Sequence, residues 1–333
     1  MWGRLTGLGG CRMLGDMASL RTTSDIDLSV DIAGLTLRNP IVTLSGTCGY
    51  GDEYAPFLDL TQLGAFTTKS VTLHPRRGNR PPRVVETVGG MLNAIGLANV
   101  GLDRFVSEKL PTLGRIGVPA LVNVAGHTLD EYVQVCQVLD GEAAVAGLEL
   151  NVSCPNVSDG LVFGTDPKAL GELVGAVRQV VRRSVLIVKL SPNVTDITQT
   201  AAAAVEAGAD ALSMVNTFVG MAVDIERQQA VLANTTGGLS GPAIRPLALH
   251  LIHRVYKAVA GPANVPIIGM GGVADWRDAV AFMLAGATAV GIGTAMFVDP
   301  TLPVQVTAGI EAYLRRRGLK AVRDLTGRLQ SPS

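Results

Sequence analysis

Eight short apolar runs, rich in β-branched residues, recur along the chain. Within each run the apolar residues are largely consecutive, as in strands that are buried on both faces of a parallel sheet. Gly, Ser, Thr, Asn, Lys or Cys residues lie at their C-terminal ends. We expect strands at residues 41–47, 65–71, 120–126, 148–154, 185–191, 211–217, 266–272 and 288–294.

Amphipathic stretches separate many of these runs, and several of them begin with a capping Thr, Asp or Pro. They occupy residues 128–139, 166–182, 196–208, 243–259 and 274–285. Strands that alternate with helices indicate an α/β protein with a parallel sheet, and eight such units close a (β/α)8 TIM barrel. A doubly wound open sheet is the alternative, and the number of strands favours the barrel.

Three further segments are expected to lie around this barrel. Residues 27–37 alternate around a turn-like Ala33-Gly34, which predicts an N-terminal β-hairpin that closes one end of the core. Two extended loops, residues 74–90 and 218–241, follow the second and sixth strands. Because such barrels build their active sites at the C-terminal ends of the strands, we expect both loops to fold over this mouth.

The two ends of the chain lack the pattern of the barrel. Residues 1–16 are rich in Gly and show no apolar period. We interpret residues 1–24 as disordered or as an extension upstream of the true start, with Met17 as an alternative start. Residues 25–316 are expected to form the barrel, and residues 317–333 a C-terminal tail.

The charge of the chain is balanced, with 28 Lys and Arg against 28 Asp and Glu. Binding to nucleic acid or to an anionic membrane depends on a surplus of clustered basic residues, which this sequence lacks. No apolar stretch reaches the ~18 residues of a transmembrane helix, and the N-terminus shows no apolar segment of a signal peptide. We therefore expect a cytoplasmic protein with no nucleic-acid or membrane partner.

The cysteines and histidines give no sign of a metal site. Cys11, Cys48, Cys136 and Cys154 form no C-x2-C pair, which argues against a zinc ribbon, an iron–sulfur cluster or a disulfide framework in this chain. The histidines lie in loops or share one helix face without a nearby carboxylate. We expect no bound metal.

Glycine-rich segments end the last two strands, GMGGV at residues 269–273 and GIGTAM at residues 291–296. Glycines at these positions let backbone N–H groups approach an anion, which predicts the phosphate site of the barrel. The alternative is that the glycines only relieve crowding inside the barrel. Neither segment completes G-x-G-x-x-G, so a Rossmann dinucleotide site is not supported.

Two lysines interrupt otherwise apolar strands near their C-terminal ends. Lys69 and Lys189 would be costly to bury without an anionic partner. A phosphate, a substrate carboxylate or a reduced flavin would each provide one. The alternative is a carboxylate that belongs to the barrel itself.

Amide and thiol side chains recur at the same level of the predicted barrel. Amides lie at strand or loop ends at Asn93, Asn123, Asn151, Asn156 and Asn216. Because amides both donate and accept hydrogen bonds, their convergence suits a flat heterocycle such as a pyrimidine or an isoalloxazine edge. Cys154 ends the fourth strand, where it is either a buried inert thiol or a base or nucleophile. The role of Cys48 stays open.

Ordered motifs along residues 28–297 resemble the dihydroorotate dehydrogenases, the flavin enzymes of pyrimidine synthesis. The motifs are SGTCGYG, TTKSVT, NAIGLANVGLD, NVSCPNV, VKLSPNVTD, VNT, GGLSGPAI, GMGGV and GIGTAM. The resemblance implies one FMN per chain and the oxidation of dihydroorotate to orotate. It further implies that Cys154 is the catalytic base, which removes the C5 proton while hydride leaves C6 for FMN.

The same resemblance implies the residues of the site. FMN would contact Ser45, Lys69, Ser70, Asn123, Asn151, Lys189, Val215, Gly241, Gly271, Gly272, Gly293 and Thr294. The substrate would contact Lys69, Asn93, Ala94, Ile95, Gly96, Leu97, Asn151, Asn216 and Thr217, with Asn156 as a weaker candidate.

Within the family, the chain resembles the subgroup called class 1B. The membrane-bound class has Ser in place of Cys154 and an additional apolar N-terminal helix, and neither feature is found in this sequence. Class 1B implies a homodimeric core in a heterotetramer with an electron-transfer subunit, which carries FAD and a 2Fe-2S cluster and passes electrons to NAD. Two alternatives remain, a class 1A-type enzyme that uses fumarate and a flavin-free phosphate-binding barrel that acts as a lyase, synthase or scaffold.

Overall fold

The computed structural model describes residues 25–153 and 163–330. Residues 1–24, Cys154 and Asn156 lie outside the described residues, so the predictions for them stay predictions. The domain boundaries expected from the sequence also stay a prediction. Within the described ranges, no helix is long and apolar enough to cross a membrane.

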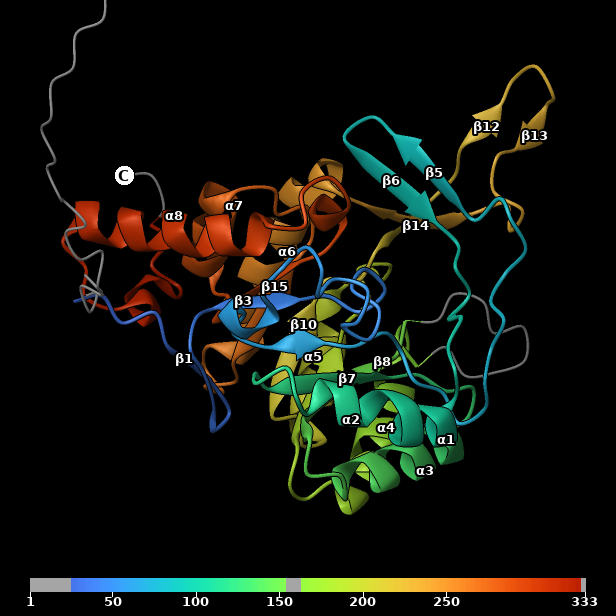
Figure 1. Cartoon of the computed structure of the whole chain (residues 1–333), viewed down its shortest axis with the longest axis horizontal. Helices are drawn as coiled ribbons and strands as arrows, with labels where there is room; N and C mark the ends of the chain where they lie inside the picture. The colour runs from blue at the N-terminus through green and yellow to red at the C-terminus, as the bar shows by residue number, and fades with distance from the viewer. Residues whose placement is uncertain (1–24, 154–162, 331–333) are drawn as a thin grey trace, which may run out of the picture.

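Eight parallel strands form a barrel at the centre of the described structure (Figure 1). In hydrogen-bonded order they are β3 (Ile41–Thr43), β16 (Ala289–Ile292), β15 (Ile267–Met270), β10 (Ala211–Met214), β9 (Val185–Lys189), β8 (Val145–Asn151), β7 (Ala120–Val124) and β4 (Phe66–Thr67). A parallel bridge between Val42 and Ala65 joins β3 to the start of β4. Each predicted run overlaps one of these strands. The predicted (β/α)8 barrel is therefore confirmed, and the doubly wound alternative is wrong.

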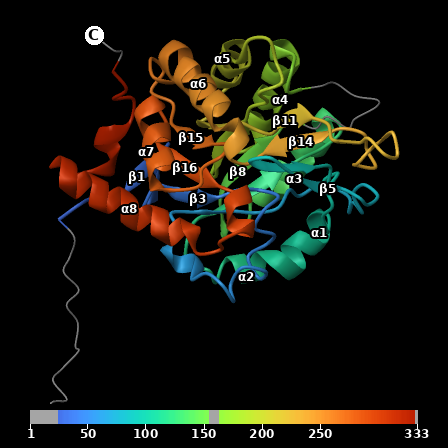
Figure 2. The same cartoon turned by 90° about the horizontal axis from the view of Figure 1, so that it is seen from above.

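Helices surround the barrel on its outer side (Figure 2). They are α1 (Leu102–Arg104), α2 (Leu110–Leu113), α3 (Leu129–Asp140), α4 (Pro167–Val180), α5 (Ile197–Glu206), α6 (Arg245–Val255), α7 (Trp276–Ala285) and α8 (Leu302–Arg317). Short 3-10 and π turns lie at Leu60–Gln62, Phe105–Lys109, Pro242–Ile244, Tyr256–Ala260, Thr294–Phe297 and Val322–Leu325.

The starts of four of these helices follow the capping signals in the sequence. The side chains of Thr128, Asp166, Asp196 and Asp275 each accept a hydrogen bond from a backbone N–H in the first helical turn. Such caps satisfy N–H groups that have no partner inside the helix. The five predicted amphipathic stretches each overlap one helix, from α3 to α7.

The N-terminal hairpin is present as β1 (Val30–Ile32) and β2 (Leu35–Leu37), which pair antiparallel. Its side chains Ile32 and Leu37 are buried in the main core. The end of the chain packs nearby, since Asp27 N–H donates to Lys320 O and Val322 N–H donates to Asp27 O, both at 2.8 Å. The described part of the expected C-terminal tail is thus attached to the barrel domain.

The two extended loops pair with each other. The loops contain β5 (Val84–Thr87), β11 (Phe218–Gly220) and β14 (Gly237–Ser240), and β6 (Gly90–Asn93) begins where the first loop ends. These four strands form one sheet in the order β11-β14-β6-β5. A hairpin of β12 (Val223–Asp224) and β13 (Gln229–Ala230) extends beyond this sheet (Figure 1). The sequence predicts where the loops lie but does not predict that they join, because residues 91–93 and 237–240 are far apart along the chain.

Candidate active site

A cavity of about 280 Å³ lies at the C-terminal ends of the barrel strands. Every barrel strand except β7 contributes lining residues from its end or from the loop that follows. The sheet formed by the two extended loops adds residues from β5, β6 and β14, so these loops border the mouth as expected. Barrels of this fold build their active sites at this position.

The cavity brings together nearly all the described residues that were predicted to bind a ligand. They are Ser45, Lys69, Ser70, Asn93, Ala94, Ile95, Gly96, Leu97, Asn151, Lys189, Val215, Asn216, Thr217, Gly241, Gly271, Gly272, Gly293 and Thr294. Asn123 is the exception, since it is fully buried and accepts a hydrogen bond from the lining residue Ser70. Cys154 and Asn156 lie outside the described residues.

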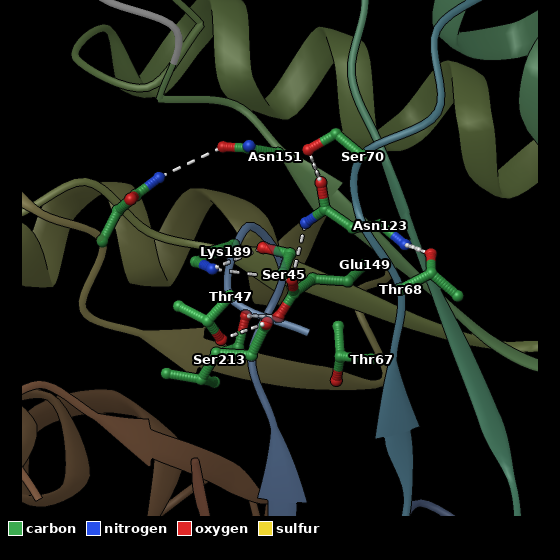
Figure 3. A network of polar contacts seen from close by, with 12 residues as sticks. Ser45, Thr47, Thr67, Thr68, Ser70, Asn123, Glu149, Asn151, Lys189 and Ser213 are labelled. Atoms are coloured by element: carbon green, nitrogen blue, oxygen red, sulfur yellow. Dashed lines mark hydrogen bonds and ion pairs between the residues drawn. The ribbon is translucent and has the colours of Figure 1, made fainter. Parts of the chain in front are cut away.

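A buried polar network lies inside the barrel next to the cavity (Figure 3). Its centre is Glu149 on β8, which is only 2% exposed. One carboxylate oxygen accepts a hydrogen bond from Asn123 Nδ2 at 2.6 Å, and the other accepts one from Ser213 Oγ at 2.7 Å. Because Ser213 lies on β10, two strands away from β8, this second bond crosses the interior of the barrel.

Lys189 connects the network to the cavity. Its ammonium lies 3.7 Å from Glu149 Oε1 and donates a hydrogen bond to Ser45 Oγ at 3.1 Å. Lys189 and Glu149 are both buried, and Lys189 also lines the cavity. The alternative of a carboxylate from the barrel is therefore correct for Lys189, although this lysine still faces the space for a ligand.

Glu149 is absent from the residues that the sequence predicts for the site. The signal that marks the two lysines, a charged residue in an apolar strand, also marks Glu149 in the run LELNV. A buried lysine needs an anionic partner, and the carboxylate in LELNV was a candidate for that partner in the sequence.

Lys69 follows the end of β4 and is only partly buried. Among the described residues, its ammonium has no ion pair and no hydrogen bond. Desolvation lowers the pKa of Lys69 below its ordinary value of 10.5, while the nearby charges of Glu53 and Arg83 act in opposite directions. An anionic ligand beside this ammonium would stabilise its charged form.

Amide groups reach the cavity from β6, from β8 and from the segment after β10. Asn216 Nδ2 donates a hydrogen bond to Asn151 Oδ1 at 3.1 Å, and Thr217 N–H donates to Asn216 Oδ1 at 2.8 Å. Asn93 Nδ2 donates to Gly238 O at 3.3 Å. Because their neighbours hold these amides in place, the amides can offer fixed donors and acceptors to a flat heterocycle.

Ser153 lines the cavity directly before the segment that is not described. Its hydroxyl oxygen is buried and has no hydrogen-bond partner within residues 25–153 and 163–330. Since a buried hydroxyl without a partner is costly, a polar group bound in the cavity would satisfy it. Together with the ammonium of Lys69, this hydroxyl indicates a cavity that fits a polar, anionic ligand.

Glycines form another part of the cavity wall. Gly241 and Gly272 have φ angles of 98° and 84°, in the region that favours glycine. A Cβ on Gly272 would lie 2.7 Å from Gly241 O, and a Cβ on Gly241 would lie 2.6 Å from Gly90 Cα. Close packing therefore requires both glycines, and for Gly272 this is the crowding that the alternative explanation named. The same packing leaves a stretch of backbone without side chains at the cavity, which a phosphate site also needs.

The two described cysteines are buried core residues. Burial raises the pKa of the Cys48 thiol to about 11, and its sulfur lies 3.6 Å from Met296 Sδ. Burial also raises the pKa of Cys136, on α3. Neither thiol lines the cavity. Within the described ranges, no group of His, Cys, Asp and Glu residues could hold a metal ion.

Known proteins match the chain over nearly its whole length. The sequence profile of the family described as dihydroorotate dehydrogenase matches residues 27–314. A protein of Geotalea daltonii named dihydroorotate dehydrogenase B (NAD(+)), catalytic subunit, is 54% identical over 305 residues, which are 91% of this chain and 98% of that protein. Proteins of the same name from Geotalea uraniireducens and Geobacter sulfurreducens are 53% and 52% identical, over 91% of this chain and 98% of each relative.

Proposed function

The chain belongs to the dihydroorotate dehydrogenase family, a family of flavin-dependent oxidoreductases, and we propose that it oxidises dihydroorotate to orotate in pyrimidine (UMP) biosynthesis. The observation that carries this proposal is the composition of the cavity wall. Fixed amides, the ammonium of Lys69 and a stretch of bare backbone meet there. A pyrimidine with a carboxylate matches the amides and the ammonium, and the phosphate of a flavin matches the glycine backbone.

We propose FMN as the flavin, with one molecule per chain. Its contacts would come from Ser45, Lys69, Ser70, Asn151, Lys189, Val215, Gly241, Gly271, Gly272, Gly293 and Thr294. Asn123 would not contact FMN directly but would orient Ser70, whose hydroxyl donates a hydrogen bond to it. Bound FMN would supply the acceptor for the hydride that leaves C6 of dihydroorotate.

The substrate would be held by the cavity residues on the side of the amides. Lys69, Asn93, Ala94, Ile95, Gly96, Leu97, Asn151, Asn216 and Thr217 are the proposed contacts. The ammonium of Lys69 would pair with the substrate carboxylate, and the amides would bind the C=O and N–H groups of the ring. Asn156 remains a weaker candidate outside the described residues.

Cys154 is proposed as the base that removes the C5 proton. Cys154 is the residue next to Ser153, and Ser153 lines the cavity. This adjacency supports the assignment. An ordinary thiol has a pKa of about 8.5, so the rate of proton removal should rise with pH until the thiolate predominates.

The electrons are proposed to leave through a partner. The names of the relatives contain the words NAD(+) and catalytic subunit, which support a partner subunit and an NAD-linked reaction. We propose in addition that the assembly is cytoplasmic and that its core is a homodimer of this chain. FAD and a 2Fe-2S cluster would belong to that subunit and would connect this chain to NAD. The sequence of this chain itself contains neither a cysteine cluster nor the G-x-G-x-x-G fingerprint.

The experiment that tests this function begins with the colour of the purified chain. We expect a yellow protein that releases FMN on denaturation and oxidises dihydroorotate with an artificial electron acceptor, but reduces NAD poorly without a partner. A colourless protein without FMN would contradict the proposal and favour a flavin-free barrel. Efficient use of fumarate by the isolated chain would leave the flavin site intact but contradict the NAD-linked assembly.

A further inference from the structure

Glu149 does not line the cavity, yet it is connected to side chains that do. It accepts a hydrogen bond from Asn123 and lies 3.7 Å from the ammonium of Lys189. Asn123 accepts a hydrogen bond from Ser70, and Lys189 donates one to Ser45 (Figure 3). The buried carboxylate of Glu149 is thus connected to the cavity wall in two ways, through Asn123 to Ser70 and through Lys189 to Ser45.

The strand register brings these groups together. Glu149 on β8 lies opposite Asn123 on β7, and Lys189 on β9 lies opposite Ser213 on β10. Neighbouring strands in register direct such side chains to the same face of the sheet. The bond from Ser213 to Glu149 shows that this face is the interior of the barrel. The orientation of the carboxylate is therefore set by β-strands and not by mobile loops.

The charges of this group nearly cancel. In a buried site, an ammonium and a carboxylate interact strongly because little water screens them. Lys189 beside Glu149 can still donate hydrogen bonds, but the pair contributes little net charge to the cavity. Without the carboxylate, Lys189 would present a full positive charge to whatever occupies that space.

We propose that Glu149 is a positioning residue that also limits the positive charge that Lys189 would present to a flavin in the cavity. It fixes the amide of Asn123 and the ammonium of Lys189, and it reduces the stabilisation that Lys189 gives to the negative charge of reduced flavin. This inference rests on the proposed function, since it requires a flavin in the cavity. Its consequence is a flavin that gives up its electrons readily.

The test compares the affinities for reduced and oxidised FMN in the wild type and in Glu149→Gln. Gln keeps the shape of the side chain and removes its charge. We expect the affinity for reduced FMN, relative to oxidised FMN, to rise about tenfold, which is an upward shift of ~30 mV in the two-electron potential of the bound flavin. An unchanged or smaller ratio in this variant overturns the inference.

Asp140→Asn is the matched control. Asp140 is also a buried carboxylate, but its oxygens accept hydrogen bonds from the backbone N–H groups of Arg182 and Ser184, and it does not line the cavity. We expect no change in the affinity ratio of this variant. A shift as large as that of Glu149→Gln would overturn the inference, because loss of any buried carboxylate would then produce it.

A double variant shows whether Glu149 acts through Lys189. With both Glu149→Gln and Lys189→Met, neither charge remains, and we expect the affinity ratio to return to within about twofold of the wild type. A double variant that keeps the shift of Glu149→Gln overturns the inference. The double variant leaves no unpaired buried ion, so it should fold even if the single variant does not. In that case an affinity ratio of the double variant that differs more than about twofold from the wild type overturns the inference.

The wild type separates this inference from the function on which it rests. A wild-type chain that binds no flavin would contradict the proposed function and the inference together. A flavin-bound wild type with an unchanged affinity ratio in Glu149→Gln would contradict the inference alone.

Discussion

Lys69 and Lys189 both lie near the C-terminal end of an apolar run in the sequence, and both line the cavity. Lys189 is buried beside Glu149, whereas the ammonium of Lys69 has no ion pair among the described residues. The barrel thus compensates one charge by itself and leaves the other for a ligand. The same pattern in the sequence therefore marks two different tasks, a buried charge pair that supports the site and a cation that is available for binding.

The largest effect on stability is expected from Lys189→Met, which removes one partner of the buried Lys189–Glu149 pair. This variant leaves the carboxylate of Glu149 buried without its counter-charge, so the flavin-free protein should lose about 3–5 kcal/mol of unfolding free energy. Urea unfolding measures this loss. Adding Glu149→Gln should recover most of it. A loss below about 1 kcal/mol, as for an exposed ion pair, would contradict the assignment of this pair as buried and mutually dependent.

Lys69→Met tests the other region and should affect binding instead of folding. Removal of a charged hydrogen bond typically costs about 1.5–3 kcal/mol, so the Kd for orotate should rise roughly tenfold to a hundredfold. The stability of the ligand-free protein should stay the same or increase slightly, because a desolvated ammonium is removed. A titration of flavin absorbance with orotate measures the Kd. Unchanged orotate binding would show that Lys69 is not the cation that binds the ligand.

The pH dependence of orotate binding is a smaller effect that sharpens the same comparison. The pKa of Lys69 is lowered, so its ammonium begins to lose its proton at a lower pH than an ordinary lysine. Orotate binding should be strongest while Lys69 is protonated, and should weaken as the pH rises towards 10.5. In Lys69→Met, the affinity for orotate measured between pH 7 and pH 10 should not show this decline. A decline of equal size in that variant would assign it to another group.

The barrel could be predicted from the sequence because the patterns that indicate its strands and helices are local. Each buried strand carries its own apolar run, and each predicted helix carries its own amphipathic pattern and, at Asp166 or Asp275, its own cap. The N-terminal hairpin likewise depends on one short turn at Ala33-Gly34. Local patterns of this kind predict which strands and helices form. The number of strand–helix units, eight, then predicts that the sheet closes into a barrel.

The polar contacts of the site were harder to predict from the sequence because they join distant parts of the chain. The bonds from Asn123 and Ser213 to Glu149 depend on strand register and on the curvature of the barrel. The pairing of β6 with β14 depends on the path of two long loops. An isolated sequence marks Asn123 as polar, but it does not show that this amide faces a carboxylate instead of the cavity.

Proton removal by Cys154 from a substrate bound in this cavity is the central step of the proposed reaction. The measurement is the rate at which dihydroorotate bleaches the flavin absorbance of the purified protein without oxygen, in the wild type and in Cys154→Ala. We predict complete bleaching of the wild type, and a rate at least ~10²-fold slower in the variant, which loses its general base but keeps its flavin. A wild type whose flavin is not bleached, or a variant that is bleached at the wild-type rate, would contradict the account.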